Sequence, residues 1–192
     1  MQAIPTHSNR SRLPARRDIL GVFSAVLFVV FGWSIRGFLY KIPAFALYFG
    51  LGTNLAILCY MFAFALIESI LVTGTLVVVA AILPPGVFRQ GFSYKGFIVV
   101  LVASVAMILF EGYYQSAFFK DIMAGNDSSI PPFVLGSVAS LIALAALLWV
   151  AHVQPRVRRV AQYIVDQLSI FAYIYVPLGL LGLAVVILRN LR

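Results

Sequence analysis

The chain contains apolar runs that are too long for a soluble fold. Residues 19–35 and 168–188 carry no charged side chain, and residues 42–83 carry a single one, Glu68. A helix needs about 20 apolar residues to cross the hydrocarbon core of a bilayer. Hydrophobic residues make up 62% of the chain and charged residues only 10%, where soluble domains have about 25% charged residues. The sequence therefore predicts an all-α, polytopic integral membrane protein.

Prolines, glycines and short polar stretches divide the apolar sequence into five predicted transmembrane helices. A basic, flexible tail at residues 1–18 precedes one helical membrane domain, residues 19–188. We expect the five helices near residues 19–35, 54–83, 96–114, 133–151 and 168–188. Their short connections leave no room for a folded soluble domain.

The stretch 42–83 permits two interpretations, because it is too long for one crossing and has no polar loop in its middle. Residues 43–52 could lie in the interface or re-enter the membrane before one long helix from about residue 54. Alternatively, two helices could join through a tight turn. The turn-forming residues of this stretch cluster near its start, at Gly50–Asn54, which favours an interfacial or re-entrant segment.

The basic residues predict the orientation of the helices. With one crossing in the stretch 42–83, the larger basic group falls on one side: Arg10, Arg12, Arg16, Arg17, Arg89, Lys95, Arg156, Arg158 and Arg159. The smaller group falls on the other side: Arg36, Lys41, Lys120, Arg189 and Arg192. Cytoplasmic loops carry the excess of Lys and Arg. We therefore expect an inside N-terminus and an outside C-terminus, in a plasma or inner membrane.

Residues 155–167 form a predicted juxtamembrane amphipathic helix, because apolar side chains recur every three or four positions. Its basic residues are candidates for contact with anionic lipid headgroups or with a partner protein: Arg156, Arg158 and Arg159. The alternative is an ordinary helical run-in to the last crossing. In the last predicted helix itself, Pro177 predicts a kink.

Glu68 is the candidate functional residue that stands out, because a charge in the middle of a membrane helix costs about 2.5–3.5 kcal/mol on insertion scales. One interpretation is proton or cation handling, supported by the nearby hydroxyls of Ser69 and Thr73. The other is that Glu68 hydrogen-bonds to a neighbouring helix or a partner subunit. Glu111 is a second intramembrane polar candidate, near the end of the third predicted helix, within reach of headgroups or Lys120.

Catalytic and cofactor signatures are absent from the sequence. The two histidines, His7 and His152, lie far apart and have no acid or cysteine at ligand spacing, so we expect no metal site and no cofactor. The sequence contains no nucleophile triad and no phosphate-binding loop. The basic residues lie at the ends of apolar runs, which argues against nucleic-acid binding.

These observations favour a non-enzymatic accessory, scaffold or anchor subunit that contacts the bilayer and other membrane subunits. A small transporter or channel that uses Glu68 is the alternative. The predicted architecture of five helices also resembles the membrane part of extracytoplasmic phosphotransferases of the lipoteichoic-acid-synthase and phosphoethanolamine-transferase type. That resemblance rests on architecture alone and implies a membrane module that works with a separate extracytoplasmic enzyme.

Overall fold

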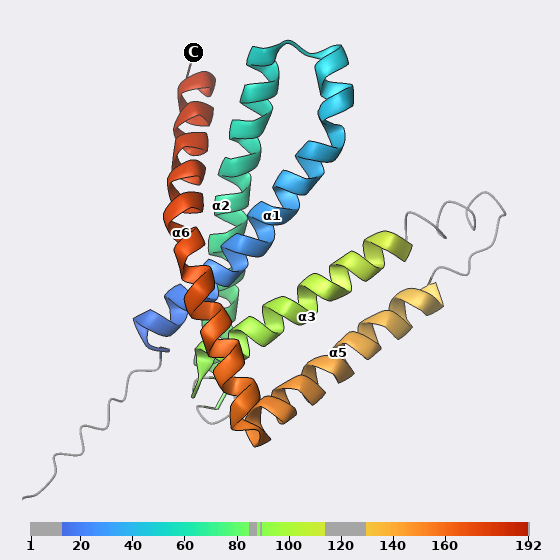
Figure 1. Ribbon diagram of the computed structural model, residues 1–192, viewed down its shortest axis with the longest axis vertical. Coiled ribbons are helices and arrows are strands. Elements are labelled where there is room, and N and C mark those ends of the chain that lie inside the picture. Colours follow the sequence, from blue (N-terminus) through green and yellow to red (C-terminus); the bar gives the residue numbers. More distant parts are fainter. Residues whose placement is uncertain (1–12, 85–87, 89, 114–129, 192) are drawn as a thin grey trace, which may run out of the picture.

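The computed structural model describes residues 13–84, 88, 90–113 and 130–191, and this part of the chain is helical (Figure 1). All five helices are long and apolar enough to cross a membrane, which confirms the all-helical prediction and indicates an integral membrane protein. Residues 1–12 of the predicted tail and Tyr114 lie outside the described residues. The helices are α1 (Arg16–Tyr48), α2 (Leu51–Ile82), α3 (Phe92–Tyr113), α5 (Ile130–Val153) and α6 (Pro155–Asn190).

Helix α1 is longer than the first predicted helix, 19–35, because it continues through Pro43 to Tyr48. The turn to α2 is short. Asn54 caps it: its side-chain Nδ2 donates to the carbonyl oxygens of Phe45 at 3.4 Å and Phe49 at 3.3 Å. The Phe45 carbonyl oxygen also accepts from the Phe49 backbone N–H, at 2.8 Å. Residues 43–48 are thus the last turns of α1, and their interfacial or re-entrant position stays a prediction. Between residues 42 and 83, α2 is the helix that is long enough to cross a membrane.

Helices α1, α2 and α6 pack together as a bundle around aromatic rings. Phe31 of α1 is fully buried. Its ring stacks on Tyr175 of α6, with centroids 4.8 Å apart, and on Phe62 of α2, with centroids 5.7 Å apart. Leu27 and Leu66 complete this part of the core. The bundle therefore joins residues from the start, the middle and the end of the sequence.

Glycines allow these helices to approach closely. A Cβ added at Gly182 of α6 would lie 2.5 Å from the carbonyl oxygen of Cys59 in α2, and one at Gly179 would lie 2.7 Å from Leu66 Cβ. Small residues serve the same purpose in many membrane helix pairs, because packing rather than hydrophobic burial drives their association.

Helices α3 and α5 run side by side, and Figure 1 shows that they point away from the three-helix bundle. Most of their packing with the bundle lies at one end, where Tyr94 and Ile98 of α3 pack with Ala151 of α5 and Ala161 of α6. We call this the basal end: α1, α3 and α6 begin near it, and α2 and α5 end near it. The opposite end is the distal end.

Helix α6 includes both the predicted amphipathic segment, 155–167, and the last predicted crossing, 168–188, without interruption. Pro155 occupies its first turn, where proline's missing N–H costs no hydrogen bond. Figure 1 shows α6 changing direction partway along its length. Pro177 is the proline inside the helix.

Candidate functional site

The intramembrane polar candidates on α2 lie on different faces of the helix. Glu68 is exposed, whereas Ser69 is fully buried and Thr73 is only 5% exposed. Adjacent residues of an α-helix point about 100° apart, so one residue of sequence separates the outer face from the bundle interior. The structure therefore does not assemble Glu68, Ser69 and Thr73 into one polar site.

Glu68 lies near the middle of the 32-residue α2, on a face made of apolar side chains. Phe64 and Leu71, one turn before and one turn after it, are each 65% exposed. Among the described residues, Glu68 has no hydrogen bond or ion pair. A carboxyl group in this position would meet hydrocarbon in a bilayer, which is costly unless another molecule supplies a polar group.

Ser69 and Thr73 face the interior of the bundle and differ in their hydrogen bonding. Ser69 Oγ donates to the carbonyl oxygen of Ala65, one turn back, at 2.7 Å. The Thr73 hydroxyl is buried and makes no hydrogen bond among the described residues. A serine bonded to its own helix is satisfied locally, so Ser69 needs no polar partner on another helix.

Glu111 makes a contact with α1 that could not be predicted from residue spacing. Its carboxylate Oε2 accepts from Arg36 Nη1 of α1 at 3.5 Å, and the Arg36 guanidinium also lies 4.9 Å from the centroid of the Trp33 ring. The pair links α1 to the outer part of α3. The expected partner Lys120 lies outside the described residues. Arg36 and Glu111 are 75 residues apart, so only the fold brings them together.

Six basic residues of the larger basic group lie in the described part of the chain, at the basal end: Arg16, Arg17, Lys95, Arg156, Arg158 and Arg159. Arg156, Arg158 and Arg159 are all exposed at the start of α6. The Arg158 guanidinium lies 5.9 Å from the centroid of the Tyr94 ring, and Lys95 Nζ lies 5.8 Å from the same ring.

The side chain of Lys95 is only 7% exposed, although its position at the end of an apolar run predicted an exposed charge. The neighbouring Gly96, where a Cβ would lie 2.6 Å from Val22 Cγ2 of α1, is the sequence signal that could have predicted close packing there.

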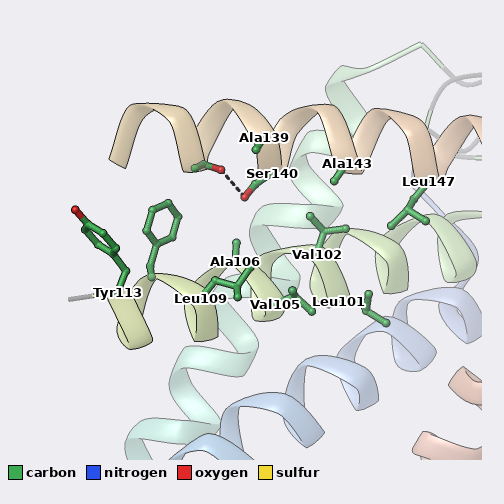
Figure 2. A pocket seen from close by; sticks show the side chains of 12 residues that line it. Leu101, Val102, Val105, Ala106, Leu109, Tyr113, Ala139, Ser140, Ala143 and Leu147 are labelled. Carbon is green, nitrogen blue, oxygen red and sulfur yellow. Dashed lines mark hydrogen bonds between the residues drawn. The ribbon is translucent and has the colours of Figure 1, made fainter. Parts of the chain in front are cut away.

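A groove of about 450 Å³ separates α3 from α5. Figure 2 shows its apolar side chains and, on α5, the small residues Ala139, Ser140 and Ala143. Ser140 Oγ donates to the carbonyl oxygen of Gly136, at 2.8 Å, within α5. These small residues leave space between the two helices, whereas at Gly136 the helices are close: a Cβ there would lie 2.9 Å from Phe110 Cζ of α3.

Neither a metal site nor a similarity to a known protein identifies a functional site in the described residues. Within the described ranges, no group of three or more His, Cys, Asp or Glu side chains could hold a metal ion. The strongest site candidates are therefore the exposed Glu68 and the charged basal end. Comparison with known proteins finds no matching family model, no matching curated protein and no matching solved structure.

Proposed function

We propose that this protein is a non-enzymatic accessory or scaffold subunit of a larger membrane complex. The observation that carries the proposal is Glu68, an unpaired acidic side chain near the middle of α2 on an exposed apolar face. We name this face, formed by Phe64, Ile67, Glu68, Leu71 and Val72, the Glu68 face. Another transmembrane helix would cover the apolar side chains and satisfy the carboxyl group.

The chemistry of Glu68 specifies the partner. A helix that presents a hydrogen-bond donor or a basic side chain at the same depth would pair with the carboxyl group. Polar contacts between membrane helices contribute about 0.6–2 kcal/mol each. Because α2 is already packed against α1 and α6 on its other side, the Glu68 face is available without any rearrangement of the bundle.

The orientation belongs to the same proposal. Basic residues at the basal end include Arg16, Arg17 and Lys95, together with Arg156, Arg158 and Arg159 at the start of α6. The positive-inside tendency favours the cytoplasm for such an end. The N-terminus is then inside and the C-terminus outside, in a plasma or inner membrane. Arg156 and Arg159 would contact anionic headgroups there.

The geometry favours docking over transport. A proton or cation path through Glu68 would need further polar groups along its course, and the hydroxyls of Ser69 and Thr73 lie on the buried side of α2, away from the exposed carboxyl group. A separate extracytoplasmic phosphotransferase would be one specific kind of partner for such a subunit.

Co-purification with matched variants tests this function. The full chain is purified from its own membranes in mild detergent as wild type, as Glu68→Leu and as Glu111→Leu. Glu111→Leu makes the same substitution at a glutamate that faces Arg36. We expect one other membrane protein to co-purify in fixed ratio with the wild type and with Glu111→Leu. We expect this protein to be absent from the Glu68→Leu preparation. A wild-type protein that runs as a monomer without any fixed partner would refute the proposal.

A further inference from the structure

A second groove, of about 660 Å³, lies between the first turns of α1 and the middle of α6. Its lining is mainly apolar, with Leu20 and Phe23 from α1 and Ala172 and Val176 from α6. Two charged side chains, Arg17 and Asp166, also line it. This groove is separate from the Glu68 face and from the space between α3 and α5.

The two charges lie at the same end of the groove, because α1 and α6 run parallel. A Cβ on Gly21 would lie 2.6 Å from Val165 Cγ1, and further along both helices Phe31 stacks on Tyr175. Arg17 precedes Gly21 by one turn, and Asp166 follows Val165 directly. Val176 and Pro177 line the other end of the groove. The two charges therefore lie toward the basal end, and the rest of the lining is mainly apolar but includes Ser24, Ser169 and Tyr173.

Arg17 and Asp166 share the groove without pairing. Both side chains are exposed, and among the described residues neither forms an ion pair or a side-chain hydrogen bond. One groove thus offers a positive and a negative group to the same ligand. The neighbouring acid Asp18 separates Arg17 from residues 19–35, which carry no charge. Arg17 therefore stands close to the boundary of the apolar run, at the level expected for lipid headgroups.

We propose that this groove binds a zwitterionic phospholipid whose headgroup carries a primary ammonium group. The phosphate accepts hydrogen bonds from the Arg17 guanidinium, and the ammonium group of the same headgroup donates to the Asp166 carboxylate. Both contacts are charge-assisted, the stronger class of hydrogen bond. One acyl chain follows Leu20, Phe23, Ala172 and Val176 along the groove. A headgroup with negative charge alone would satisfy Arg17 but would be repelled by Asp166.

Lipid titration of the full chain tests the proposal. The protein is delipidated in detergent and titrated with short-chain phosphatidylethanolamine or phosphatidylglycerol, and bound lipid is counted by native mass spectrometry. We expect phosphatidylethanolamine to bind roughly tenfold more tightly, which corresponds to about 1.4 kcal/mol. Asp166→Asn should remove this preference, and Arg17→Gln should weaken the binding of both lipids.

Two further variants keep the outcome decisive. Arg189→Gln removes an arginine from the distal end of α6 and should leave both affinities unchanged. Leu20→Trp places a large side chain in the groove at a position that is 62% exposed, so it should block binding without disturbing the core. Equal binding of the two lipids by the wild type, or an unchanged preference in Asp166→Asn, would overturn the proposal. Full binding by a folded Leu20→Trp would also overturn it, because the lipid would then lie outside this groove.

Discussion

Gly182 of α6 lies directly against the backbone of Cys59 in α2: a Cβ at Gly182 would be 2.5 Å from the Cys59 carbonyl oxygen and 3.0 Å from the Ala63 amide nitrogen. Backbone atoms inside a helix cannot move aside as the end of a flexible side chain can. This contact sets how closely α2 and α6 approach, and these helices carry the Glu68 face and one wall of the lipid groove.

Gly182→Ala should therefore destabilise the bundle. Overpacking of this kind costs about 1–3 kcal/mol, which we expect as a lower midpoint of unfolding in mild detergent. Gly74→Ala is the matched control, because it makes the same change in α2 where nothing lies within 4 Å of the added Cβ. The control should be neutral or slightly stabilising, since alanine favours helix more than glycine does. Equal midpoints for the two variants would contradict the packing described for α2 and α6.

Substitution of Phe31 should lower the stability of the isolated protein strongly. Its ring is fully buried between Phe62 and Tyr175, and removal of a buried phenylalanine side chain costs roughly 3–5 kcal/mol. Phe31→Ala should lower the unfolding midpoint strongly, whereas Phe64→Ala should leave it nearly unchanged because Phe64 is 65% exposed. The same loss of stability in both variants would show that the bundle core is assigned wrongly.

The ion pair between Arg36 and Glu111 should contribute only weakly to the stability of the fold. Their side chains are 67% and 35% exposed, and exposed ion pairs contribute about 0.2–1 kcal/mol. A double-mutant cycle with Arg36→Gln and Glu111→Gln, measured by unfolding, should give a coupling energy in that range. The cycle of Arg36→Gln with Glu68→Gln should give none, because Glu68 is not paired with Arg36. Equal coupling in the two cycles would argue against a specific contact between α1 and α3.

The sequence predicted the number of membrane-length helices in the described part of the chain, because apolar length is a strong signal in membrane proteins. It placed helix ends less well. The first helix was expected to end near residue 35, but α1 continues past Arg36, Lys41 and Pro43 to Tyr48. Proline is tolerated in membrane helices, where neighbouring groups satisfy the freed carbonyls, so Pro43 was a weaker helix-ending signal than it would be in a soluble protein.

The sequence could not predict which helix faces are buried. In a soluble helix the apolar stripe marks the core, but α2 is apolar on all sides, so the same side chains can face lipid or protein. The sequence therefore suggests that Glu68 and Ser69 belong to one polar site, although Glu68 is exposed and Ser69 is buried. The grouping of Arg17 with Asp166 was also missed, because only the parallel packing of α1 and α6 brings these distant residues to one groove.

Site-specific photocrosslinking tests the central claim, a partner helix on the Glu68 face, most directly. A photoreactive residue replaces Phe64 or Leu71 on this face, or Leu141 on α5, each of which is 65% exposed. After irradiation of intact membranes, we predict the same protein adduct from positions 64 and 71, and no such adduct from position 141. Addition of Glu68→Leu should weaken binding of the partner about three- to thirtyfold, which lowers the yield of the adduct. Lipid adducts alone at all three positions, or a protein adduct that Glu68→Leu leaves unchanged, would contradict the claim.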